Sequence, residues 1–173
     1  MALAILAREG PSGVRIERLA RELGATKGSF YWHFRDRREF DRQMLDEWLR
    51  LTNTEILDQV ADDGVSAEAR LRKLGRLTTK AGEPGGLREL ERGVRAWAAF
   101  EPAVARRVEA VERDRLAALS GLFRAHGFSP AEAETRAYLF VFYVAGDAVS
   151  AVRDSPARRE RLLKRRLDLL LER

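Results

Sequence analysis

The stretch GATKGSFYWHFRDRREF, residues 24–40, mixes aromatic rings with hydrogen-bond donors and cations. Rings stand at positions 30, 31, 32 and 34, next to Lys27, Ser29 and His33. Phe30 and Phe34 lie four residues apart, so a helix over this stretch places both on one edge. We therefore predict a short helix over residues 27–33 that its phenylalanines hold in place and whose outer face is polar and aromatic.

A second short helix precedes this one. Apolar residues repeat at i, i+3, i+4 and i+7 from Ile16 to Leu23, the spacing of a one-sided helix. Gly24 supplies the backbone freedom that ends it, and the Thr26 hydroxyl can cap the next helix. Two short helices joined by GAT have the proportions of a helix-turn-helix.

The second helix of a helix-turn-helix enters the major groove of DNA, with its N-terminal residues nearest the base edges. In this sequence Lys27 can donate to guanine and Ser29 can bond to either kind of base. Gly28 allows close approach of the backbone, while Tyr31 and Trp32 can pack on sugars or thymine methyl groups. Trp32 is also suited to the core of the domain, and both interpretations stay open at this point.

Three further residues are suited to the phosphate backbone. Thr26 brings a hydroxyl at the positive end of the helix, and His33 and Arg37 stand at its other end. The competing interpretation is that the FYWHF run packs only in a core. The helix spacing, the GAT turn and the position of Arg37 together favour DNA binding.

These residues resemble the signature of TetR-family transcriptional regulators, and the resemblance covers residues 2–45. IERLARELG matches the first motif helix of that family, and the signature itself matches at Gly24, Ala25, Thr26, Phe30, Tyr31, His33, Phe34, Asp36 and Arg37. Weaker resemblance to the family's variable effector domain continues over residues 95–137, RAWAAFEPAVARRVEAVERDRLAALSGLFRAHGFSPAEAETRA.

Two departures from the family pattern are visible. Arg15 stands where the family has a capping Thr or Ser, so either Ser12 caps the helix or its first turn frays. Family members also carry a longer and often basic segment before the first helix. We expect either a truncated start or a member that lacks this arm.

The rest of the chain predicts an all-α protein, because Ala, Leu, Glu and Arg dominate and no alternating β-branched run occurs. We expect a short first helix before Gly10, a linker helix over 36–62, and a loop over 80–86. Ser66 and Glu68 open a further helix, and the Ser129 capping sequence opens another. The remaining helices are expected over 87–99, 102–125, 130–152 and 157–171. We place the domains at 1–43, helix-turn-helix, and 44–173, ligand binding and dimerisation.

Composition and charge limit the kinds of partner and site that the chain can have. Residues 1–43 hold nine Lys or Arg against six Asp or Glu, whereas residues 44–152 hold fifteen against seventeen. A basic front end favours a polyanion, although the same charge also serves solubility. The chain has no Cys and two His, which excludes disulfides, thiolate metal sites and a histidine-rich metal centre. No apolar run approaches the roughly 18 residues of a membrane span, so we expect a cytoplasmic protein without cofactors.

The resemblance implies that the C-terminal helices bind a small-molecule effector and form a homodimer. The expected apolar pocket is lined by Trp48, Leu51, Trp97, Phe100, Tyr138 and Phe142. The expected dimer interface, a four-helix seam, uses Phe140, Tyr143, Val144, Leu163, Leu167 and Leu170. Each of the pocket residues is equally suited to an ordinary core, and Glu91 with Arg95 predicts a surface ion pair.

The expected function is a regulator, most simply a repressor, that an effector releases from its operator when the linker helix moves. A helical enzyme is disfavoured because no HExxH, carboxylate–histidine pair or phosphate loop stands out. A ligand-binding or interaction module that has lost specific DNA binding is the main alternative. The basic amphipathic last helix could also lie on a membrane surface.

Overall fold

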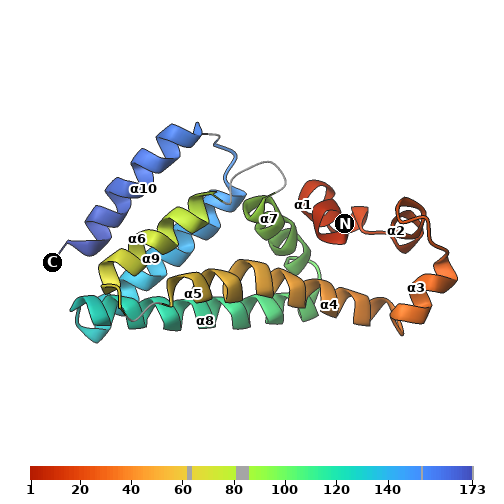
Figure 1. Cartoon of the computed structure of the whole chain (residues 1–173), viewed down its shortest axis with the longest axis horizontal. Coiled ribbons are helices and arrows are strands. Elements are labelled where there is room, and N and C mark those ends of the chain that lie inside the picture. The colour runs from red at the N-terminus through yellow and green to blue at the C-terminus, as the bar shows by residue number, and fades with distance from the viewer. Residues whose placement is uncertain (62–63, 81–85, 153, 173) are drawn as a thin grey trace.

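The computed structural model describes residues 1–61, 64–80, 86–152 and 154–172, and these residues form helices without any strand (Figure 1). The N-terminal elements are α1 Ala2–Glu9, the 3-10 turn η1 Pro11–Gly13, α2 Ile16–Glu22 and α3 Lys27–His33. They are followed by α4 Arg37–Leu49, the π-helical turn η2 Arg50–Thr54 and α5 Glu55–Val60. The body continues with α6 Ala67–Lys80, α7 Leu87–Ala98, α8 Pro102–His126, α9 Pro130–Val149 and α10 Pro156–Leu171. The prediction of an all-α chain with an N-terminal helix-turn-helix is confirmed.

The helix-turn-helix lies at one end of an elongated molecule. Figure 1 shows α2 and α3 at the end opposite α10 and the C-terminus, with α4, α5 and α8 running along the length between them. The recognition candidate α3 is therefore kept clear of the body.

The predicted linker helix over 36–62 is found as three consecutive pieces. Asp36 caps its start, because Oδ1 accepts from the backbone N–H of Glu39 at 2.8 Å. After α4 the helix widens into the turn η2, where the Thr52 hydroxyl donates to the carbonyl of Trp48 at 2.8 Å. It then continues as α5 to Val60. Its predicted last residue, Asp62, lies outside the described residues, as do residues 81–85 of the predicted loop.

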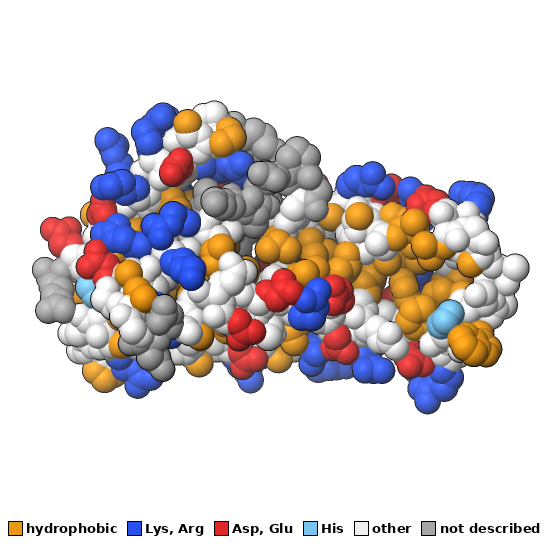
Figure 2. Space-filling model, viewed as in Figure 1, with side chains coloured by type: hydrophobic (Ala, Val, Ile, Leu, Met, Phe, Trp, Pro, Cys, Tyr) orange, Lys and Arg blue, Asp and Glu red, His pale blue; other side chains and the backbone are white. Residues whose placement is uncertain are grey.

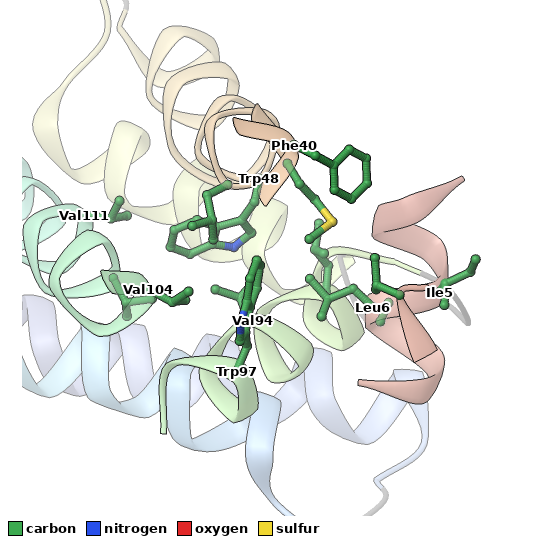
Figure 3. Packing of buried hydrophobic residues seen from close by; sticks show 14 of the residues in the cluster. Ile5, Leu6, Phe40, Trp48, Val94, Trp97, Val104 and Val111 are labelled. Carbon is green, nitrogen blue, oxygen red and sulfur yellow. The ribbon is translucent and has the colours of Figure 1, made fainter. Parts of the chain in front are cut away.

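The first hydrophobic cluster joins the DNA-binding end to the body. Trp48 of α4 is completely buried and lies among α7 and α8 side chains, with α1 packed on the other side (Figure 3). The buried members labelled in that view are Ile5, Leu6, Phe40, Trp48, Val94, Trp97, Val104 and Val111. Because this cluster spans both sides of residue 43, α1 and α4 are fixed against α7.

The second cluster lies in the body and uses the other half of α8. Leu119, Leu122 and Phe123 meet α5, α6, α9 and α10 there. α10 packs closely on α6, since a Cβ on Gly75 would stand 2.8 Å from the Leu167 side chain. α8 therefore contributes to both cores along its 25 residues.

Helix termini follow the local sequence. Ser129 and Glu132 form the predicted capping box at the start of α9. Arg15 occupies the N-cap of α2 without a side-chain cap, and its Nε donates instead to the carbonyl of Ser12 at 3.2 Å. The Ser12 side chain does not take over the cap, yet the first turn is formed, with the Leu19 N–H bonded to the Arg15 carbonyl at 2.9 Å.

Gly93 marks the closest approach of α7 to α1. A Cβ at this position would stand 2.5 Å from the carbonyl oxygen of Leu6, a backbone atom that cannot move away cheaply. We expect Gly93→Ala to destabilise the protein by about 1–3 kcal/mol, the usual cost of overpacking. Gly121→Ala in α8 meets nothing within 4 Å and is expected to stabilise by about 0.5–1 kcal/mol. Urea unfolding followed by circular dichroism checks the pair, and equal effects of the two alanines would contradict the close approach.

Candidate DNA-binding surface and ligand cavity

The turn between α2 and α3 orients the second helix. Gly24 has φ 63°, in the left-handed region that glycine favours. Thr26 caps α3, because its Oγ1 accepts from the Ser29 N–H at 3.1 Å. The capping role predicted for Thr26 is confirmed, and its hydroxyl is thereby used within the free protein.

Phenylalanines hold the inner edge of α3. The rings of Phe30 and Phe34 lie 4.9 Å apart, and each lies within 5.2 Å of the Phe40 ring on α4. Both side chains are half-buried, and they pack against the first hydrophobic cluster. This contact ties the orientation of α3 directly to α4.

The outer side of α3 carries the predicted DNA contacts. Lys27, Ser29, Tyr31, Trp32 and His33 are all exposed, and the Trp32 side chain is 83% exposed. Trp32 packs edge-on against His33, with ring centroids 4.8 Å apart, and so lies outside the core of the domain. A Cβ on Gly28 would meet only Thr26 Oγ1, at 3.6 Å, so the backbone there is open to a partner. At this end of the molecule Figure 2 shows a histidine next to an exposed hydrophobic side chain, and both are accessible to a partner.

Lys27 is paired in the free protein. Its Nζ lies 2.8 Å from Oε1 of Glu17 on α2, and this hydrogen bond raises the pKa of Lys27 above its ordinary value. Both side chains are exposed, so the pair contributes little to stability. A base or phosphate at α3 has to compete with Glu17 for the ammonium group.

Arg37 does not stand free as a phosphate ligand. Its Nη1 donates to the carbonyl of Val14 at 2.8 Å, and its Nε donates to Asp41 Oδ1 at 2.7 Å. The guanidinium therefore braces the start of α4 against the segment before α2. The neighbouring Arg35 and Arg38 are exposed instead.

The body contains a cavity of about 100 Å³ between η2, α5, α6, α7, α8, α9 and α10. Its apolar wall comes mainly from Ile56, Leu57, Leu74, Leu87, Leu119, Phe140, Val141 and Val144. Its polar wall includes Thr52, Asn53, Thr78, Arg88, Glu91, Arg115, Tyr143, Asp147 and Arg159. A mostly apolar wall with a few polar groups is what small-molecule sites share.

The six residues expected to line a pocket do not line this cavity. Trp48 and Trp97 are buried in the first cluster, and Leu51 packs against it. Phe100 is 87% exposed beyond the end of α7, while Tyr138 and Phe142 stack on each other on the outer side of α9. These six side chains fill a core or face outward, and the aromatic part of the cavity wall comes from Phe140 and Tyr143 instead.

Glu91 and Arg95 form the predicted ion pair, but the prediction of a surface location is wrong. Glu91 is 7% exposed, and its Oε1 lies 2.9 Å from Arg95 Nη2 and 3.0 Å from Arg115 Nη1. Trp48 Nε1 donates to its Oε2 at 3.2 Å. Burial alone raises the pKa of Glu91, but Arg115, Arg95 and the Trp48 N–H more than offset this and hold the pKa below its ordinary value.

The residues expected at the dimer interface face mainly into the subunit. Phe140, Leu163 and Leu167 are buried in the second cluster, while Tyr143, Val144 and Leu170 are partly buried against it. The exposed apolar residues of α9 are Tyr138, Leu139, Phe142 and Val149. α9 is apolar nearly all round, and its own subunit covers the face on which the prediction relied.

Two kinds of site have no candidate among the described residues. No group of three or more His, Cys, Asp or Glu is arranged to hold a metal ion there. In the same part of the chain, no helix is long and apolar enough to cross a membrane.

Known proteins match the N-terminal segment of the chain in sequence and the whole chain in structure. Residues 1–41 match the family model of bacterial regulatory proteins of the tetR family. No curated protein matches the chain. A transcriptional regulator from Rhodococcus sp. Rha1 has a similar structure, with a TM-score of 0.73 at 23% identity, over 98% of this chain and 89% of that chain. A TetR-family regulator structure from Rhodococcus sp. gives 0.74 at 19% identity, over 99% of this chain and 95% of that chain.

One similar structure includes DNA. BioQ, solved with its natural double-stranded DNA operator, has a TM-score of 0.54 at 23% identity, over 99% of this chain and 96% of that chain. At these identities the structural matches establish a common fold along the whole length, and the match over residues 1–41 establishes the DNA-binding domain. The chain therefore carries an N-terminal domain of the tetR family within a fold that transcriptional regulators share along its whole length.

Proposed function

We propose that the protein is a homodimeric repressor that a small molecule in the cavity releases from its operator. The observation that carries this proposal is the position of η2. Thr52 and Asn53 of this turn line the cavity, and the same helix continues toward the DNA as α4. Phe40 of α4 contacts Phe30 of α3, with ring centroids 5.2 Å apart. A change at the cavity therefore has a continuous helical connection to the recognition helix.

We assign the DNA contacts to the outer face of α3 and its capped start. Lys27, Ser29 and Gly28 stand at the N-terminal end, where a recognition helix meets base edges. Tyr31, Trp32 and His33 are suited to the sugar–phosphate backbone. The operator complex of BioQ supports double-stranded DNA as the partner.

We assign the dimer interface to the outer face of α9. Its exposed apolar residues Tyr138, Leu139, Phe142 and Val149 recur at helical spacing, and the first and third of them stack with ring centroids 5.6 Å apart. Contiguous exposed apolar surface of this kind marks interaction sites. One short helix contacts too few bases to be specific by itself. A dimer brings two α3 helices to half-sites about one helical turn of DNA apart.

The release mechanism is a two-state equilibrium. A ligand shifts it only by the difference between its affinities for the DNA-binding and released arrangements. Linkage requires the reciprocal effect, so operator DNA must weaken ligand binding by the same factor.

The central test is selection of operator sequences from a random duplex pool, followed by binding measurements with and without ligands. We expect a two-fold symmetric site whose affinity falls steeply with salt, because phosphate contacts release counterions, and a ligand that lowers this affinity. A flat salt dependence without sequence preference would favour an interaction module instead. Unchanged operator affinity with every ligand that occupies the cavity would refute release.

Lys27→Ala and Tyr31→Ala are expected to weaken operator binding about tenfold each, as loss of a base or backbone contact typically costs about 1–3 kcal/mol per contact. The estimate for Lys27 is at the lower end because the ammonium gives up Glu17 on binding. Fluorescence anisotropy with a labelled operator measures the change.

Lys164→Ala is the matched control for Lys27→Ala. Lys164 also forms an exposed ion pair, with Asp168 at 3.0 Å, but it lies on α10 at the opposite end of the molecule (Figure 1). Equal loss of affinity in both lysine variants would mean that general charge, rather than α3, carries DNA binding.

A further inference from the structure

The charged groups around the cavity already have partners within the protein. Arg115 Nη1 lies 3.0 Å from Glu91 Oε1, and its Nη2 donates to Thr52 Oγ1 at 3.0 Å. Arg88 Nε donates to the carbonyl of Asp147 at 2.9 Å and lies 3.2 Å from its carboxylate. A charged ligand would have to break one of these pairs, and breaking a buried pair is costly.

The remaining charged and hydroxyl groups of the wall are likewise engaged. Arg159 interacts within the protein, and the Thr78 hydroxyl donates to the carbonyl of Gly75 at 2.8 Å. Tyr143 has the Arg166 guanidinium 4.2 Å from its ring centroid. The charges of Arg88, Asp147, Glu91 and Arg115 are therefore compensated within the wall itself.

Asn53 is the exception. Its side chain lines the cavity and the residue is only 8% exposed, yet the amide makes no hydrogen bond with any described residue. A primary amide carries two donors and an acceptor, and in Asn53 these groups face the space of the cavity. A neutral ligand group that both donates and accepts can bond to them without disturbing the ion pairs.

We infer that the cavity binds a small, neutral, mostly apolar molecule with one hydroxyl, carbonyl or amide group that hydrogen-bonds to Asn53. The volume of about 100 Å³ is of the same order as that of an engineered apolar cavity of about 150 Å³ that binds benzene, so it limits the ligand to about one ring in size. The aliphatic wall takes the apolar part of the molecule, and Asn53 selects its polar group.

The position of Asn53 gives this ligand a route to the DNA-binding end. Asn53 belongs to the π-helical turn η2, and π-turns are often functional sites. Its neighbour Thr52 is bonded both to the Trp48 carbonyl and to Arg115. A ligand on Asn53 therefore contacts the π-helical turn that joins α4 to α5. This part of the inference rests on the proposed release from DNA.

Four probes of matched size test the ligand class on the whole protein without DNA: benzyl alcohol, toluene, benzoate and benzylamine. Calorimetric titration is expected to rank benzyl alcohol first. Asn53→Leu is expected to weaken benzyl alcohol about tenfold, the value of one hydrogen bond in a buried site, and to leave toluene unchanged or tighter. Thr78→Val removes a hydroxyl that is already bonded, and it should leave the ratio of alcohol to toluene affinity unchanged.

The inference is overturned if benzoate or benzylamine binds more tightly than benzyl alcohol, if no probe binds, or if Asn53→Leu leaves the alcohol-to-toluene ratio intact. Should Asn53→Leu fail to fold, the side-chain amide resonances of Asn53 in the wild-type protein decide. They must shift with benzyl alcohol well beyond the shift with toluene, and equal shifts overturn the inference. Operator affinity is measured in a separate experiment. If benzyl alcohol binds but the protein stays on its operator, the proposed release from DNA is refuted and the inferred ligand class is not.

Discussion

Replacing Glu91 by alanine is expected to lower the free energy of unfolding by about 3–5 kcal/mol, because removal of one partner leaves buried charge uncompensated. Glu91 is the shared partner of Arg95 and Arg115 and also accepts from the Trp48 indole. Its loss affects both the first hydrophobic cluster and the cavity wall. Urea unfolding followed by far-UV circular dichroism measures the change.

Glu109→Ala provides the control for Glu91→Ala. Glu109 pairs with Arg113 four residues later on the exposed side of α8, and its removal is expected to cost less than about 1 kcal/mol.

The pKa of Glu91 is held below its ordinary value. The contribution of Glu91 to stability is therefore complete above the ordinary pKa of a glutamate and is lost as pH falls through the lowered pKa. The difference in stability between wild type and Glu91→Ala should therefore shrink in acid. A constant difference, or equal costs of the two alanines, would contradict the buried network.

The recognition helix could be predicted in detail because its information is local. Phe30 and Phe34 repeat at helical spacing, and Thr26 stands directly before the helix that it caps. The role of Arg37 could not be predicted from its neighbours in the sequence. Its partner Val14 lies 23 residues away, and only the assembled domain shows that the guanidinium is used inside it.

The cavity and the proposed dimer surface depend on contacts between segments that lie far apart in the sequence. Aromatic content suggested a pocket around Trp48 and Trp97, but large rings that pack well leave no space between them. The turn η2 places a wider winding between α4 and α5 without any Gly or Pro that would indicate it in the sequence. α9 is apolar on most sides, so its periodicity cannot tell which side its own subunit covers.

Phe142→Arg is expected to convert the protein from dimer to monomer and to weaken operator binding at least about 100-fold. Phe142 is 54% exposed in the middle of the outer face of α9, and truncation or charging of a central aromatic commonly removes an interface. Two linked half-sites then become independent, and the avidity of roughly 10²–10⁴ that links them is lost. Sedimentation velocity measures the mass, and anisotropy with the operator measures the affinity.

Phe100→Arg makes the same change at an exposed phenylalanine away from α9. Phe100 lies between α7 and α8 and is 87% exposed, so its substitution should preserve both dimer and operator affinity. Far-UV circular dichroism should show equal helix content in the two variants, because neither side chain is buried in its own subunit. A dimeric Phe142→Arg protein with normal operator affinity would place the interface elsewhere. A monomeric protein that still binds the operator at wild-type affinity would mean instead that α3 reads its site without a partner subunit.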